Sequence, residues 1–123
     1  MSKAHKISIV DDDELFREAM QVLVCSLGYD DVEVFASAED FLNSDRLRDT
    51  ACLITDVQMP GMSGLDLYKR LLAQGHRMPV IFMSGFSEGY ARASAMEAAA
   101  VGFLDKPIDC QHLIECLNKA LVG

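Results

Sequence analysis

Short apolar segments alternate with amphipathic helical segments along the chain, and this alternation constrains its fold more than any other feature. Four apolar segments are nearly continuous, as expected of parallel strands buried on both faces, and they lie at 7–10, 52–54, 80–83 and 101–104. A fifth segment, 32–35, is more mixed and is typical of an edge strand. Strict alternation of strands with helices predicts an α/β fold with a doubly wound, five-stranded parallel sheet.

Five helices are expected between and after these strands. The first has an apolar residue at every fourth position, which predicts its buried side: Leu15, Ala19, Leu23 and Leu27. Gly28 follows as a natural C-terminal cap. We therefore expect this helix to end near residue 27.

Capping residues and apolar repeats predict the other helices. Three of them have candidate N-terminal capping residues: Ser37 with Asp40, Ser63 with Asp66, and Asp109 alone. The last helix is predicted to bury a stripe of Leu113, Leu117 and Leu121. The segment 88–100 is rich in alanine and weakly amphipathic, and we interpret it as the fourth helix.

The composition favours one acidic domain. With 123 residues, half of them hydrophobic, the chain can form a single ordinary core. Its net charge of −8 disfavours direct binding to nucleic acid or to an anionic membrane surface. The charge suits a cation, or a partner with a basic face.

The cysteines and the N-terminus predict a cytoplasmic protein. No Cys-x-x-Cys or zinc-site spacing occurs, so we interpret all the cysteines as reduced core thiols, at Cys25, Cys52, Cys110 and Cys116. Residues 1–9 lack the apolar region of a signal peptide. No run approaches the ~18 apolar residues of a membrane span.

Charged and polar residues follow four of the predicted strands. Asp11, Asp12 and Asp13 come after the first strand and Asp56 after the third, and Ser84 and Lys106 follow the last two. In doubly wound sheets, ligands bind beyond the carboxyl ends of the strands, so we expect these side chains to lie together.

Three of the acids predict a metal site. At ~6 Å separation and an effective dielectric near 20, each carboxylate pair repels by about 3 kcal/mol, so folding alone would not favour grouping Asp11, Asp12 and Asp56. A hard divalent cation offsets the repulsion, and oxygen ligands suit Mg²⁺. Asp13 is better explained as the cap of the first helix. Lys106 beside such a cluster can bind a phosphate as a point charge.

Four segments, in order, resemble the motifs of response-regulator receiver domains, most closely those of the FixJ type. They read IVDDD at 9–13, TDVQMPGMSG at 55–64, MSG at 83–85 and GFLDKP at 102–107. The resemblance covers essentially the whole chain, so residues 1–123 are expected to form one receiver domain with the flavodoxin-like strand order 2-1-3-4-5.

The resemblance also implies a role for each site residue. Asp56 would be the phosphoacceptor, and Asp11, Asp12, Asp56 and the backbone carbonyl of Gln58 would hold Mg²⁺. Ser84 and Lys106 would each bind a phosphoryl oxygen. The switch residues would be Ser84 and Phe103, and Pro107 would follow a cis peptide bond.

The resemblance further implies a signalling phosphoacceptor that assists only its own phosphorylation and dephosphorylation, and is not an enzyme. A sensor histidine kinase would donate the phosphoryl group from a phosphohistidine. Phosphorylation would shift the face formed by the fourth helix, fifth strand and fifth helix, and so control an output domain, a partner or self-association. The alanines of 88–100 would let that helix shift at low cost.

Three alternatives remain at this point. An aspartyl phosphohydrolase usually needs a second acid two residues after its nucleophile, and Gln58 cannot be a general acid. A flavodoxin-like cofactor carrier would need a phosphate-binding loop where Asp11–Asp13 lie. A receiver-like module that is never phosphorylated would not need every acceptor residue. The sequence does not name the kinase, and both a single-domain regulator and an N-terminal domain of a longer protein are compatible with it.

Overall fold

The described residues of the computed structural model are 5–85 and 100–121. They contain five strands: β1 Lys6–Val10, β2 Asp31–Phe35, β3 Cys52–Asp56, β4 Val80–Ser84 and β5 Gly102–Asp105. All neighbouring strands pair in parallel, in the order β2-β1-β3-β4-β5. The predicted sheet, its order and its edge strand β2 are confirmed.

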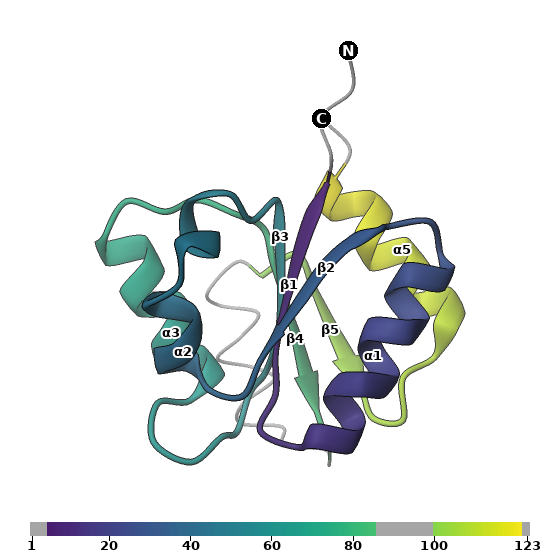
Figure 1. Ribbon diagram of the computed structural model, residues 1–123, viewed down its shortest axis with the longest axis horizontal. Helices are drawn as coiled ribbons and strands as arrows, with labels where there is room; N and C mark the ends of the chain where they lie inside the picture. The colour runs from purple at the N-terminus through teal and green to yellow at the C-terminus, as the bar shows by residue number, and fades with distance from the viewer. Residues whose placement is uncertain (1–4, 86–99, 122–123) are drawn as a thin grey trace.

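Helices cover both faces of this sheet (Figure 1). Helices α1 (Glu14–Ser26) and α5 (Cys110–Leu121) lie over one face, and α2 (Ala38–Leu42) and α3 (Gly64–Ala73) over the other. A short 3₁₀ helix, η1 (Asp45–Arg48), follows α2. The predicted helix at 88–100 lies outside the described residues except for Ala100. No helix in the described part of the chain is long and apolar enough to cross a membrane.

The sheet separates two apolar clusters because successive residues of a strand point to opposite faces. Leu53 and Phe82 pack in the cluster on the α2 and α3 side, while Ile54 and Ile81 pack in the cluster on the α1 and α5 side. Every residue of β3 and β4 is buried, which explains their nearly continuous apolar sequences.

The predicted caps fix the ends of the helices. The Asp13 carboxylate accepts hydrogen bonds from the backbone of the first turn of α1, and Ser37 and Ser63 cap α2 and α3. The Asp109 carboxylate accepts a bond of 2.9 Å from the His112 N–H at the start of α5. Gly28 lies just beyond α1 with a φ of 107°, a left-handed conformation that favours glycine.

The predicted buried stripe of α1 was wrong at its first two residues, because Ala19 is exposed as well as Leu15. Leu15 is 78% exposed, whereas Met20 and Val24 are fully buried. An every-fourth-residue repeat advances about 40° around the helix at each step, so Leu15 and Leu27 lie about 120° apart. The helix rests on the side centred on Met20 and Val24, and Leu15 falls outside it.

The prediction that all the cysteines lie in the core was half wrong. All four are free thiols. Cys52 and Cys116 are buried in the cluster between the sheet and α5, but Cys25 and Cys110 are exposed. Cysteine at a helix end is as compatible with solvent as with a core, and the sequence pattern did not separate the two cases.

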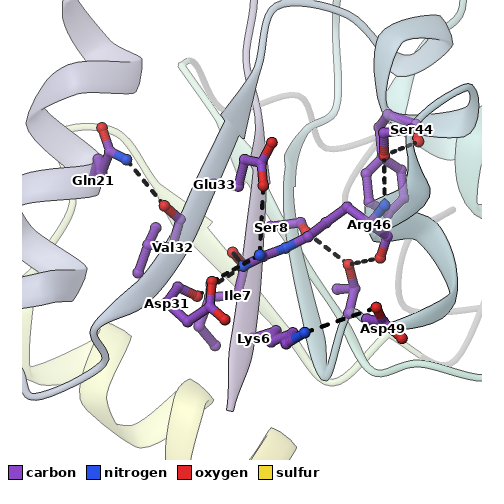
Figure 2. Close-up of polar contacts among 12 residues, drawn as sticks. Lys6, Ile7, Ser8, Gln21, Asp31, Val32, Glu33, Ser44, Arg46 and Asp49 are labelled. Carbon is purple, nitrogen blue, oxygen red and sulfur yellow. Dashed lines mark hydrogen bonds and ion pairs between the residues drawn. The ribbon is translucent and has the colours of Figure 1, made fainter. Parts of the chain in front are cut away.

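A largely buried arginine, Arg46, ties η1 to the edge of the sheet (Figure 2). The Arg46 guanidinium donates to the backbone carbonyls of Ile7 at 3.3 Å and Asp31 at 2.9 Å, one on β1 and one on β2. It also forms ion pairs with the carboxylates of Asp31 at 2.7 Å and Glu33 at 3.4 Å. This single side chain therefore bridges both strands at their N-terminal ends, opposite the edge where the acidic residues gather.

Candidate functional site

The carboxyl ends of the strands bring the predicted site residues to one edge of the sheet, at the bottom of Figure 1. Asp11 directly follows β1, Asp56 ends β3, Ser84 ends β4 and Lys106 follows β5. The backbone N–H of Lys106 donates to the carbonyl of Ser84 at 2.8 Å, which fixes the last two residues relative to each other.

Three carboxylates form a group of the kind that can hold a metal ion. One oxygen from each of Asp11, Asp12 and Asp56 lies within 4.8 Å of the others. Asp11 is fully buried, Asp56 is 8% exposed and Asp12 is exposed, so the group opens to solvent on one side. Oxygen donors around an open position are the ligands that Mg²⁺ prefers, since it usually keeps several of its waters.

The ammonium of Lys106 bridges two of these carboxylates. Its Nζ lies 2.9 Å from Asp11 Oδ2 and 3.3 Å from Asp56 Oδ2. The side chain is 21% exposed, so the bridge is largely sheltered from solvent. One fixed positive charge therefore already offsets part of the repulsion between the acids.

These contacts act on the protonation of both partners. Burial raises the pKa of Asp56, and the nearby charge of Asp11 raises it further, against the opposing effect of Lys106. Burial by itself would lower the pKa of Lys106, but the hydrogen bond that its ammonium donates to Asp11 and the charges of Asp56 and Asp11 outweigh burial and raise the pKa overall. Lys106 is therefore a permanent cation at neutral pH.

Backbone contacts hold the buried carboxylate of Asp11 in place. The Asp11 Oδ1 accepts a hydrogen bond of 2.8 Å from the Asp13 N–H. The backbone carbonyl of Asp11 accepts a bond of 2.9 Å from the Arg17 guanidinium. Arg17 was missed from the sequence. The available signal was its place in the first turns of a helix that starts at a strand end, where side chains can reach back to that edge.

The loop after β3 packs tightly against the backbone of Asp56. A Cβ added at Gly64 would lie 2.1 Å from the Asp56 carbonyl oxygen and 3.2 Å from the Val57 Cα. The Gly64 N–H also donates to the Val57 carbonyl at 2.8 Å. The glycine at this position therefore allows α3 to begin directly against the strand end that presents Asp56.

The other predicted site residues lie around this group. Ser84 is 2% exposed and Phe103 is 6% exposed, the latter packed in the apolar cluster on the α2 and α3 side. Gln58 is exposed two residues beyond Asp56. The Lys106–Pro107 peptide bond is cis.

The family model for the response regulator receiver domain matches residues 7–118. This chain belongs to the response regulator receiver domain family. The receiver has the acidic pocket typical of a phosphoacceptor site, built here from Asp11, Asp12 and Asp56. It is therefore a signalling domain of two-component systems rather than a classical enzyme.

Similar proteins include two longer regulators. The receiver is 41% identical over 119 residues to the response regulator protein TodT of Pseudomonas putida, covering 97% of the chain and 52% of TodT. It is 37% identical over 121 residues to the transcriptional regulatory protein FixJ of Azorhizobium caulinodans, covering 98% of the chain and 57% of FixJ. The chain thus spans about half the length of the curated relatives it matches.

Solved structures agree with this assignment. The crystal structure of FixJ-N aligns with a TM-score of 0.87 at 31% identity, covering 98% of the receiver and 95% of FixJ-N. Full-length FixJ from B. japonicum aligns with a TM-score of 0.84 at 33% identity, covering 98% of the receiver and 59% of that chain.

Proposed function

We propose that Asp56 accepts a phosphoryl group from a phosphohistidine of a sensor histidine kinase. Asp11, Asp12, Asp56 and the backbone carbonyl of Gln58 would hold Mg²⁺. The observation that carries the proposal is the Lys106 ammonium, which lies within 3.3 Å of the Asp56 carboxylate beside a group of three acids. A buried acceptor, a fixed cation and a set of hard oxygen donors are what phosphoryl transfer to a carboxylate requires.

The reaction needs positioning and charge neutralisation more than covalent chemistry. A carboxylate oxygen of Asp56 forms a bond to phosphorus while the bond from phosphorus to the imidazole nitrogen breaks. The electron pair of that bond stays on the imidazole, and the product on Asp56 is an acyl phosphate. When bound, Mg²⁺ would supply positive charge for the phosphoryl oxygens, and Lys106 supplies a positive charge from the protein itself.

The switch follows from the buried position of the residues around the acceptor. The Ser84 hydroxyl moves to bind a phosphoryl oxygen, and the ring of Phe103 occupies the space that this movement leaves. Phe103 lies on β5, which pairs with β4 and packs against α5, so the change reaches the outer face of these elements. Such a switch shifts an existing equilibrium between two packings.

The proposal extends to the partners of the receiver and to its location in the cell. The receiver spans about half of TodT and FixJ, which supports its control of an attached or separate output domain. Phosphorylation-dependent homodimerisation is a second route for output through β5 and α5. We also propose that the receiver is cytoplasmic, where a sensor histidine kinase would phosphorylate it.

Labelling with a small phosphodonor tests the proposal. Acetyl phosphate with Mg²⁺ should add the mass of one phosphoryl group to the intact protein. The adduct should survive acid and be removed by base or hydroxylamine, as expected of an acyl phosphate. Asp56→Ala should abolish it, and Asp49→Asn, which changes an exposed acid paired with Lys6 at 3.8 Å, should not. An adduct that persists in Asp56→Ala would show that the acceptor is another residue.

A further inference from the structure

An aromatic ring outside the predicted site lies against its cation. The Lys106 Nζ is 4.2 Å from the centroid of the Phe16 ring. This distance is well within the ~6 Å over which the face of an aromatic ring attracts an ammonium. Phe16 comes from α1, Asp56 from β3 and Lys106 from the end of β5, so the contacts of Lys106 join three separate elements at the pocket.

The position of the Phe16 ring is set on two sides. Its backbone N–H donates to the Asp13 carboxylate at 3.3 Å in the capped first turn of α1. Its side chain is partly buried against the apolar cluster between the sheet and α1. The ring is therefore anchored by the same turn that holds the Asp11 carboxylate through the Asp13 N–H.

The Lys106 ammonium is thereby oriented by groups on three sides. It has three N–H donors, and carboxylates of Asp11 and Asp56 accept at 2.9 and 3.3 Å. The ring covers a further side. It attracts the cation without carrying a formal charge, so unlike a third carboxylate it leaves the positive charge of Lys106 available to an incoming anion. It also excludes water, which strengthens the electrostatic interactions of the ammonium.

We propose that Phe16 is a positioning residue for Lys106, holding its ammonium directed at the phosphoryl group that Asp56 accepts. The inference rests on the proposed function. A lysine side chain has four rotatable bonds, and an ammonium without this ring could rotate towards water instead of towards the acceptor. Phe16 acts through Lys106 and makes no bond to the reacting atoms.

The test compares phosphorylation rates with acetyl phosphate and Mg²⁺ in Phe16→Leu, Phe16→Tyr and the unchanged protein. Removing the ring should slow phosphorylation about threefold to tenfold, and Phe16→Tyr, which keeps it, should restore the rate to within about twofold. Tyr29→Leu is the matched control, because it removes a partly buried aromatic side chain from the same apolar cluster, away from Lys106. It should leave the rate unchanged.

Two further measurements separate positioning from a general loss of packing. In a Lys106→Ala background, Phe16→Leu should have no additional effect on the rate, because the ring would have no ammonium to orient. In NMR spectra, the ε protons of Lys106 should be shifted upfield by the ring in the unchanged protein and in Phe16→Tyr, and should lose that shift in Phe16→Leu.

The outcomes distinguish this inference from the proposed function. An unchanged protein that takes up no phosphoryl group would overturn the proposed function, and with it the role of Phe16 in phosphorylation. Normal labelling with equal rates in Phe16→Leu and the unchanged protein would overturn the inference alone. Equal slowing by Phe16→Leu with and without Lys106 would also overturn it, since the effect would then be one of packing.

Discussion

Substitution of Gly64 by alanine should destabilise the protein, although alanine is the better helix former. A methyl group at this position would lie 2.1 Å from the Asp56 carbonyl oxygen, and such contacts are essentially never closer than 3.0 Å. The obstructing atoms belong to the backbone of β3, a fully buried strand, and cannot rotate away as a side chain would. Either α3 or the end of β3 must move.

The size of the effect follows from two opposing contributions. Alanine in place of glycine favours a helix by about 1 kcal/mol. Overpacking a well-packed site costs up to about 3 kcal/mol, and the rigid backbone at Gly64 places it at the upper end of that range. The net loss should be about 2 kcal/mol. With a urea dependence of about 1.5 kcal/mol per molar, the unfolding midpoint should fall by about 1.3 M.

Urea unfolding followed by circular dichroism measures this shift, with Gly85→Ala as the control. A methyl group at Gly85 would meet no atom of the described residues within 4 Å, and its φ is outside the left-handed range. That variant should remain within about 0.5 kcal/mol of the unchanged protein. If Gly64→Ala also unfolds at the unchanged midpoint, the close approach of α3 to the Asp56 backbone is wrong.

Three other predictions concern ion pairs, a buried thiol and the acidic group. Arg46→Ala should lower the free energy of unfolding by about 2–3 kcal/mol, because it removes charged hydrogen bonds from a side chain that is 12% exposed. Lys6→Ala, in a solvent-exposed pair, should lower it by less than about 1 kcal/mol. Equal losses in urea unfolding would refute this difference. Burial, with a smaller contribution from Cys116, raises the pKa of Cys52 from 9.0 to about 12, so its contribution to stability is complete below pH 9 and is lost as the pH rises towards 12. Stability should therefore fall by about 2 kcal/mol more between pH 8.5 and 10.5 than it does in Cys52→Ala, and parallel pH profiles would contradict this. Without metal, Asp56→Asn should raise the melting temperature, because burial disfavours the charged form of Asp56. It should also weaken the stabilisation by Mg²⁺, which for the unchanged protein is about 1.4 kcal/mol at a concentration ten times the dissociation constant. If Mg²⁺ does not shift the melting curve of the unchanged protein, the metal site is excluded.

The parallel sheet and the acidic group could be predicted because both depend on short, local patterns, whereas the strand order was expected from the resemblance to receiver domains. Buried parallel strands need continuous apolar residues, and the carboxyl ends of such strands must meet at one edge. Once those two facts are combined, Asp11 and Asp56 are expected together although 45 residues separate them. The caps at Asp13, Ser37 and Ser63 were equally local and were confirmed.

Features that depend on the orientation of a helix could not be predicted in the same way. The side of α1 that faces the sheet is decided by packing against β1 and β2, and an apolar repeat alone placed Leu15 inside when it is 78% exposed. The same rotation directs Phe16 towards Lys106 and Arg17 towards the Asp11 carbonyl. Gly64 ends the motif at 55–64, but only the folded structure shows which backbone atom it approaches.

The bridge from Lys106 to Asp11 and Asp56 gives the pocket an internal counter-ion. Both oxygens of the Asp11 carboxylate already accept hydrogen bonds, one from the Asp13 N–H and one from the ammonium. Any external cation must therefore compete with a tethered one that is always present at high effective concentration. This competition weakens metal affinity and lets the domain fold without a metal ion. It also makes metal binding an exchange of one cation for another at Asp11 and Asp56. The displaced Lys106 ammonium is then free to bind an incoming anion.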